Sequence, residues 1–152
     1  MSRRRVVVTG LGALAPNGND LESFWDGLTN GRSGIGPITK FDASQHRAQI
    51  AGEIKGFDPN SVLAHKEVRN NDPFTHYGVY AATQAVKHAG LEINDANAER
   101  VGVIWGSGIG GITTHEEQHG ILIEKGPKRI SPFFVPMMIT DMAAGMISMK
   151  IG

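Results

Sequence analysis

The chain has 152 residues, the size of one domain, and is long enough to bury about 70% of the surface that the unfolded chain exposes. Hydrophobic residues make up 40% and charged residues 20%, a composition typical of globular and not of disordered proteins. The 15 basic side chains balance 15 acidic ones, which argues against a dedicated binder of nucleic acid or anionic membrane, and the lack of cysteine excludes disulfides and thiolate metal sites.

Two elements are predicted near the N-terminus. Residues 6–14 (VVVTGLGAL) have the continuous apolar run of a strand that is buried on both faces at the centre of a sheet. Apolar side chains spaced three or four apart then predict a helix over residues 21–28, with Asn19 or Asp20 as its cap and Asn30-Gly31 at its end.

The middle of the chain is expected to hold loops and one long helix. Residues 34–60 are broken by glycine and proline, and a short strand is predicted near residues 50–54. Asp72-Pro73 has the sequence of a helix start, with aspartate as the cap and proline at the first helical position. This helix is expected to end at Gly90, and its alanines permit close packing.

The last third of the chain adds a second buried strand at residues 101–105 (VGVIW) and a final helix over residues 137–149. Strands that alternate with helices predict an α/β fold with a mixed or parallel sheet, in a single domain. No apolar run has the length of a transmembrane helix, and the run after the basic start at residues 1–5 is too short for a signal peptide. We therefore expect no membrane insertion and a cytoplasmic protein.

A possible zinc motif occurs at His115-Glu116-Glu117-Gln118-His119, which fits the H-E-x-x-H pattern that places two histidines on one helix face. No histidine follows His119, so a third ligand would have to be Glu124 or Asp141. The two variable positions are polar and favour a solvated helical turn, capped by Thr113-Thr114, over a metal-bearing helix. We expect no metal here.

Two glycine-rich stretches, residues 10–15 and 106–111, match dinucleotide-binding fingerprints, and each follows a predicted strand. A phosphate site needs a helix to begin at the glycines, and Pro16 with the turn at residues 17–19 interrupts any such helix in the first stretch. The glycines are better interpreted as spacers between closely packed segments, and no nucleotide or other cofactor is expected. The chain also has no G-x-S-x-G motif and no complete set of catalytic residues.

Six stretches of the sequence point to one family. They are RRRVVVTGLGALAPNGND, GRSGI, FDAS, DPFTHYGVYAATQAV, GSGIGG, and KRISPFFVP followed by DMAAGMIS. In this order they resemble the opening part of a β-ketoacyl-[acyl carrier protein] synthase of the type II elongating class, and the match covers essentially the whole chain. The resemblance implies an α/β fold of the thiolase-like type, layered α/β/α, in which residues 1–152 form an incomplete N-terminal part of the first half.

The resemblance also implies a reaction. In this family a cysteine takes an acyl group as a thioester, and malonyl-carrier protein loses carbon dioxide and attacks it, with the help of two histidines and a lysine. These groups follow the MAAG-type helix in the family, so we expect residues 1–152 to be truncated before the cysteine, to contain no catalytic residue and to be inactive alone. The implied partners are acyl carrier protein bearing acyl and malonyl thioesters, and a second copy in a homodimer.

The resemblance assigns accessory roles to six residues. Ile109 would line the acyl pocket and Phe134 would close it from the partner subunit, because a saturated chain needs apolar walls. The residues that would receive the acidic carrier protein are Lys66, Arg69, Lys128 and Arg129. Asn70 stands where many relatives have another basic residue, so docking is expected to be weaker or to be shared differently among the basic residues.

Two other interpretations are compatible with these residues. One is a polyketide-type condensing or chain-length subunit. The region of the nucleophile would separate it from a fatty-acid enzyme, since chain-length subunits replace the nucleophile. A non-catalytic fragment or binding module that acts on its own is the alternative from another class.

Overall fold

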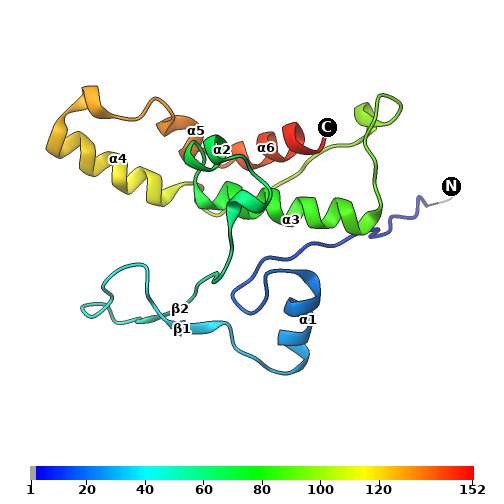
Figure 1. Ribbon diagram of the computed structural model, residues 1–152, viewed down its shortest axis with the longest axis horizontal. Coiled ribbons are helices and arrows are strands. Elements are labelled where there is room, and N and C mark those ends of the chain that lie inside the picture. Colours follow the sequence, from blue (N-terminus) through cyan, green and yellow to red (C-terminus); the bar gives the residue numbers. More distant parts are fainter. Residues whose placement is uncertain (1–2) are drawn as a thin grey trace. The chain divides into compact units, whose positions relative to one another are not determined.

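The computed structural model describes residues 3–152, in two compact units (Figure 1). The first unit comprises the chain up to Asp58 together with Thr83–Leu91, and the second comprises Pro59–Ala82 together with Glu92–Gly152. Within the described residues, no helix is both long and apolar enough to cross a membrane.

The elements of the first unit are the helix α1 (Leu21–Thr29), the strands β1 (Ile35–Pro37) and β2 (Ile50–Gly52), and the second half of α3 (Pro73–Ala89). The second unit holds the first half of α3 and a series of helices. These are η1 (Pro59–Ser61), α2 (His65–Arg69), η2 (Ala98–Arg100), α4 (Ile112–Lys125), η3 (Pro127–Arg129), α5 (Phe134–Met138) and α6 (Met142–Ile151).

In the first unit, the N-terminal segment lies directly on α3. A Cβ at Gly10 would overlap the carbonyl oxygen of Ala85, so only glycine permits this crossing. The Leu11 N–H donates to Nδ1 of His88 at 3.0 Å, and the Gln84 side-chain amide donates to the Ala13 carbonyl oxygen at 2.9 Å. The expectation that the glycines act as spacers is therefore confirmed at Gly10.

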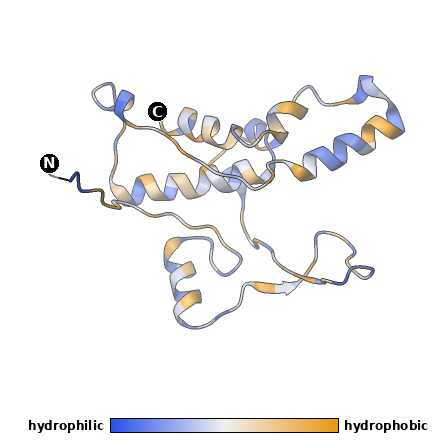
Figure 2. Ribbon diagram, turned by 180° about the vertical axis from the view of Figure 1, so that it is seen from behind, coloured by the Kyte–Doolittle hydropathy of each residue, from blue (hydrophilic) through white to orange (hydrophobic). Residues whose placement is uncertain are grey.

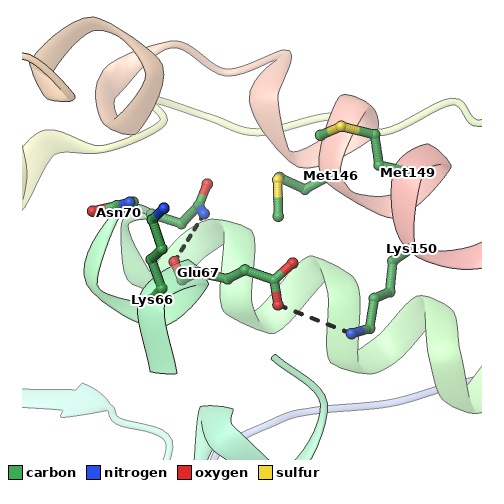
Figure 3. A pocket seen from close by; sticks show the side chains of 7 residues that line it. Lys66, Glu67, Asn70, Met146, Met149 and Lys150 are labelled. Atoms are coloured by element: carbon green, nitrogen blue, oxygen red, sulfur yellow. Dashed lines mark hydrogen bonds and ion pairs between the residues drawn. The ribbon is translucent and has the colours of Figure 1, made fainter. Parts of the chain in front are cut away.

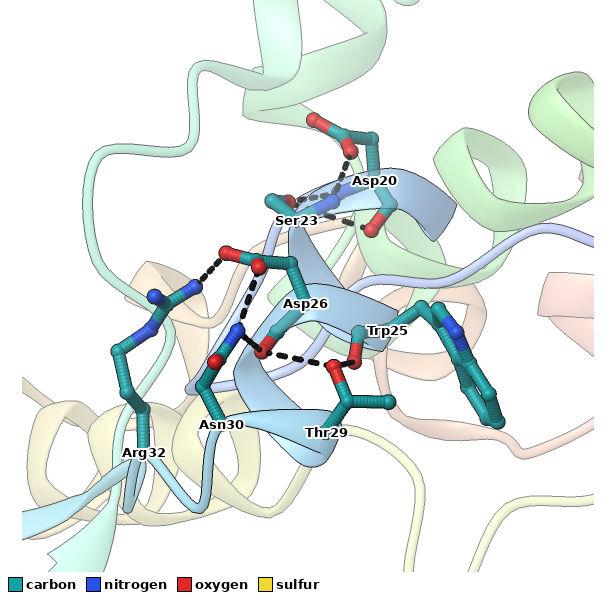
Figure 4. Close-up of polar contacts among 7 residues, drawn as sticks. All are labelled: Asp20, Ser23, Trp25, Asp26, Thr29, Asn30 and Arg32. Carbon is teal, nitrogen blue, oxygen red and sulfur yellow. Dashed lines mark hydrogen bonds and ion pairs between the residues drawn. The ribbon is translucent and has the colours of Figure 1, made fainter.

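Helix α1 begins and ends where its sequence signals predicted. The Asp20 carboxylate accepts from the Ser23 N–H at 2.8 Å, and this hydrogen bond is the main reason that the pKa of Asp20 lies below its usual value (Figure 4). At the other end, Asn30 is the C-cap and Gly31 has φ of 63°, which glycine adopts without strain. Arg32 forms an ion pair with Asp26 beside this end (Figure 4).

The only sheet in the described residues is the antiparallel pair of β1 and β2, in which Ile35 lies opposite Gly52. The predicted strand near residues 50–54 is thus present, although it is shorter. Next to it, the buried Glu53 carboxylate accepts hydrogen bonds from the Thr39 hydroxyl at 2.6 Å and the Thr39 N–H at 3.0 Å. These bonds hold the pKa of Glu53 below its usual value.

The two predicted central strands are absent from the described residues, and this prediction was wrong for the chain as it stands. Neither residues 6–14 nor residues 101–105 belong to a strand, and Val6 and Ile104 are 94% and 99% exposed. A β-strand exists only when its backbone N–H and C=O groups meet a neighbouring strand, and neither segment meets one here. Figure 2 shows the N-terminal trace changing from blue over the arginines to orange over the valines.

The core of the second unit lies between α3, α6 and the loop that precedes α2. It is formed by Leu63, Val79, Met146 and Ile147, each less than a tenth exposed. Trp105 packs over Gly78 of α3, where an added Cβ would lie 3.1 Å from the indole ring. The predicted long helix from Asp72-Pro73 to Gly90 is confirmed as α3, and Gly90 has φ of 60°.

The predicted final helix is interrupted. Residues 137–149 were expected to form one helix, but α5 ends at Met138 and α6 begins at Met142. Ile139 is extended, with φ of −71° and ψ of 140°. The break leaves the Met138 carbonyl oxygen without an intrahelical partner, and it accepts instead from the Gly111 N–H at 2.9 Å.

One buried carboxylate joins the starts of two helices in the second unit. Oδ1 of Asp72 accepts from the Phe74 N–H in the first turn of α3, at 3.3 Å. Its Oδ2 accepts from both the N–H and the hydroxyl of Thr114, at 3.2 and 2.7 Å, in the first turn of α4. Asp72 is 4% exposed and Thr114 is 3% exposed, so these bonds are shielded from water.

A buried histidine lies next to this contact. Nε2 of His76 donates to the Val68 carbonyl oxygen at 3.1 Å, which ties α3 to α2, and the residue is 7% exposed. Burial disfavours the charged imidazolium and lowers the pKa of His76, although the nearby Val68 carbonyl and the Asp72 carboxylate oppose that shift. His76 is therefore held neutral in the folded protein over a wider range of pH than in the unfolded one.

We predict that Asp72→Ala lowers the free energy of unfolding of the second unit by about 2–4 kcal/mol. The substitution removes one helix cap and leaves the buried Thr114 N–H and hydroxyl without their acceptor. Trp105 fluorescence during urea unfolding, in a Trp25→Phe background, measures the effect. Asp42→Ala is the control, because exposed Asp42 caps only its own loop through the Ser44 N–H. Equal losses of unfolding free energy in the two variants would contradict the interpretation that Asp72 caps both α3 and α4.

We also predict that the protein loses stability as the pH falls below the usual histidine pKa of 6.5. The unfolded chain then binds a proton that neutral His76 does not, so the free energy of unfolding falls by at most about 1.4 kcal/mol per pH unit and per proton. His76→Gln should flatten this slope, and the exposed His65→Gln should leave it unchanged. Denaturant titrations at several pH values below 6.5 measure how steeply the free energy of unfolding falls with pH. A slope in His76→Gln equal to that of the unmodified protein would refute the prediction.

Candidate functional site

The glycine-rich loop before α4 packs on the segment between α5 and α6. A Cβ at Gly110 would overlap the carbonyl oxygen of Met138, and one at Gly111 would overlap that of Met137. Gly110 also has φ of 79°, so both space and backbone conformation require glycine there. By contrast, Gly106 and Gly108 face open space in this structure, and the expectation that they act as spacers is not met.

An open groove with a volume of about 490 Å³ lies along this contact. Its lining residues are Ile109, Ile112, His115, Met138, Ile139, Thr140 and Asp141. One wall is the start of α4 with the loop before it, and the other is the stretch that separates α5 from α6. The groove therefore exists because the predicted final helix is broken, and it offers mainly apolar side chains to a ligand.

Of the two predicted acyl-pocket residues, Ile109 lines this groove and is 67% exposed. Phe134 is half-buried at the start of α5 and does not line it. Its ring lies against that of His115, with 6.1 Å between the centroids and 31° between the planes. His115 thus lines the groove with Ile109 and also contacts Phe134.

His115 is the lining residue that the sequence analysis misjudged. The zinc-like pattern drew attention to its spacing from His119, and the segment was expected to be a polar turn capped by Thr113-Thr114. It is instead a helix of 14 residues, with Gly111 as N-cap and Thr114 buried in its first turn. The available signal was a different spacing, because His115 follows Ile112 by three residues and so shares its face.

The zinc and nucleotide patterns have structural accounts of their own. Among residues 3–152, no three histidine, aspartate or glutamate side chains come together to hold a metal ion. Helix α4 does begin directly after the glycines of residues 106–111, as a phosphate site requires. However, the anion at that helix end is the protein's own Asp72 carboxylate, which already accepts the Thr114 N–H.

The first predicted docking pair lies on α2. Lys66 and Arg69 are both exposed and stand in the last turn of this helix, as predicted. Lys66 also borders a groove of about 240 Å³ that is lined by Met146 and Met149 as well (Figure 3). Two further lining residues, Glu67 and Lys150, lie 4.0 Å apart as an ion pair.

The second predicted pair, Lys128 and Arg129, is exposed in η3, directly after Gly126 with φ of 78°. None of the four basic side chains forms an ion pair with any of residues 3–152. The first turn of α4 is bonded to Asp72, close to α2, and η3 follows its last turn (Figure 1). Since a helix of 14 residues is about 21 Å long, the four residues form two separate basic pairs.

Comparison with known proteins identifies the family of this chain. The sequence model of the β-ketoacyl synthase N-terminal domain matches residues 3–152. The chain belongs to the β-ketoacyl synthase family. Its fold is accordingly the thiolase-like fold of the ketosynthases, as the resemblance implied, and the chain corresponds to the N-terminal part of it.

Curated relatives of this β-ketoacyl synthase chain are named 3-oxoacyl-[acyl-carrier-protein] synthase 2. The one from Synechocystis sp. is 49% identical over 152 residues, which cover all of this chain and 36% of the relative. The one from Coxiella burnetii is 49% identical over 150 residues, which cover 99% of this chain and again 36% of the relative. The chain thus spans about a third of the length of these proteins.

Solved ketosynthase structures resemble it at lower identity. The ishigamide ketosynthase/chain length factor is 27% identical, with a TM-score of 0.82, over 99% of this chain and 38% of that one. A type II PKS ketosynthase in complex with its acyl-carrier protein is 25% identical, with a TM-score of 0.79, over 97% of this chain and 40% of that one.

Proposed function

We propose that the complete protein containing this β-ketoacyl synthase chain is a 3-oxoacyl-[acyl carrier protein] synthase of fatty-acid elongation. The observation that carries the proposal is the 49% identity, along the whole chain, to relatives with that name. A cysteine outside these 152 residues would accept the acyl group from its carrier. Malonyl-carrier protein would then lose carbon dioxide, and its carbanion would attack the thioester and release the cysteine sulfur.

The role of this chain in that reaction is to provide part of the acyl pocket. Ile109 and Ile112 line the groove along α4, and each methylene that leaves water for such a wall contributes about 0.8 kcal/mol. Phe134 does not line the groove, but its ring lies against that of the lining residue His115. In a homodimer its ring would serve the pocket of the other subunit, which accounts for its position outside the groove of its own chain.

The two basic pairs are proposed to receive the acidic carrier protein. Lys66 and Arg69 on α2, and Lys128 and Arg129 in η3, are exposed and have no acidic partner within residues 3–152. Unpaired surface cations steer an anionic protein toward its site and lose strength in salt. The solved complex of a related ketosynthase with its acyl-carrier protein supports a partner of this kind.

The two alternatives have weaker support. Polyketide ketosynthases match this chain at 25–27% identity, far below the fatty-acid relatives. A stand-alone binding module would use the docking residues without the reaction. A cytoplasmic location is part of the proposal, consistent with the finding that no described helix could span a membrane.

Condensation assays test the proposal directly. The complete protein, supplied with saturated acyl-carrier protein and malonyl-carrier protein, should release carbon dioxide and form 3-oxoacyl-carrier protein, and the 152-residue chain alone should form none. Repeated extension without reduction would favour the polyketide alternative. Binding of carrier protein by the 152-residue chain, without product from the complete protein, would favour a binding module.

Charge reversal tests the docking surface. We expect Arg69→Glu and Arg129→Glu each to raise KM for the carrier protein about fivefold at low salt, because an attraction becomes a repulsion. The value of kcat should stay the same, and the effect should shrink as salt is added. Arg47→Glu is the matched control, since Arg47 is exposed in the loop between β1 and β2. An equal rise in KM for all three variants would rule out a specific surface.

A further inference from the structure

We propose that the groove between α2 and α6 receives an apolar side chain of the acidic carrier protein, beside the docking pair Lys66 and Arg69. The inference rests on the proposed function and deepens it, because it adds an apolar contact to the electrostatic attraction of the basic pairs. The groove has a volume of about 240 Å³. Pockets for drug-sized ligands usually exceed about 300 Å³, so this groove suits a single side chain and not a whole small molecule.

The apolar part of the groove comes from two methionines of α6. Met146 and Met149 are three residues apart and so share a helix face, and both line the groove (Figure 3). Met146 belongs to the core of the second unit and is 8% exposed, whereas Met149 is 70% exposed. The core thus continues into a side chain that lies largely in water. Methionine is unbranched and polarizable, so it adapts to the shape of an incoming apolar group.

The α2 side of the groove is held in place by Glu67. Its Oε2 accepts from the Ala64 N–H at 2.7 Å, at the start of α2, and lies 4.0 Å from Nζ of Lys150 on α6. The Asn71 side-chain amide donates to the Glu67 carbonyl oxygen at 2.9 Å. These contacts exist before a partner arrives, so fewer side chains must be ordered when it binds.

The charges beside the methionines favour an acidic partner. Lys66 and Lys150 both line the groove, and within residues 3–152 Glu67 is the only acidic residue that does. Lys150 pairs with Glu67, which leaves Lys66 without an ion pair in the described chain. Arg69 follows Lys66 by three residues on α2. A carrier protein that inserts an apolar side chain here therefore brings its neighbouring carboxylates close to cations.

Met149→Ser in the complete protein tests the inference. It removes the apolar contact and no charge, so we expect KM for acyl-carrier protein to rise about fivefold, with kcat unchanged. This rise should persist when salt is added, unlike the effect of Arg69→Glu, because salt screens charges and not apolar contacts. Met149→Leu keeps an apolar side chain of similar size and should leave KM within about twofold of that of the unmodified protein.

Two controls separate docking from a general loss of activity. Ile123→Ser removes an apolar side chain that is 73% exposed on α4 and does not line the groove, so KM should not change. An acyl thioester of N-acetylcysteamine contains no carrier protein, and its acyl group should be transferred to the enzyme equally well by Met149→Ser and by the unmodified protein.

Four results would overturn the inference: an unchanged KM in Met149→Ser, an equal rise in Ile123→Ser, an equal loss with the protein-free thioester, or a rise that disappears in salt. If Met149→Ser does not fold, Met149→Gln makes the same comparison with a polar side chain of similar size. A complete protein that forms no 3-oxoacyl product overturns the proposed function instead. Titration with carrier protein then decides, since weaker binding by the polar variant keeps the inference and equal binding overturns it.

Discussion

The groove depends on the Asp72 carboxylate, which joins the first turns of α3 and α4. Two separate helix starts each leave backbone N–H groups without partners, and one buried side chain accepts from both. The shared acceptor fixes where α4 begins and how it is rotated about its axis. With Thr114 turned toward Asp72, Ile112 and His115 are left to form the wall of the groove.

A second constraint acts at the other wall. Gly110 and Gly111 can lie on the carbonyl oxygens of Met137 and Met138 only because they have no side chains, and the Gly111 N–H bonds to the Met138 carbonyl oxygen at 2.9 Å. That bond takes the place of one lost where α5 ends. The glycines thus have a packing role here, and the break between α5 and α6 is the cost of opening a groove beside α4.

The sequence predicted those elements whose signals are local. Asp20 and Asp72-Pro73 mark helix starts, and Gly31 and Gly90 mark helix ends, because capping involves residues within one turn of each other. The strands at residues 6–14 and 101–105 could not be predicted in the same way, since a strand depends on a partner strand that is distant in sequence. The break between Met138 and Met142 also has a distant cause, the contact with Gly111.

The candidate site was predictable to a similar extent. The resemblance identified Ile109, and the structure places it in a groove, but the contact between Phe134 and His115 depends on the rotation of α4 and on where α5 begins. His115 was misjudged because the pattern with His119 directed attention to metal chemistry. The spacing from Ile112 carried the more useful information.

The separation of the two basic pairs has a consequence for how a partner is held. An anionic protein that contacts only the basic pair on α2, or only the pair in η3, would be attracted but could still rotate about that single contact. A partner broad enough to reach both pairs, across the length of α4, would lose this freedom and present one fixed side to this surface. In the proposed docking, the distance between the pairs would therefore select for the size and orientation of the partner, beyond its charge.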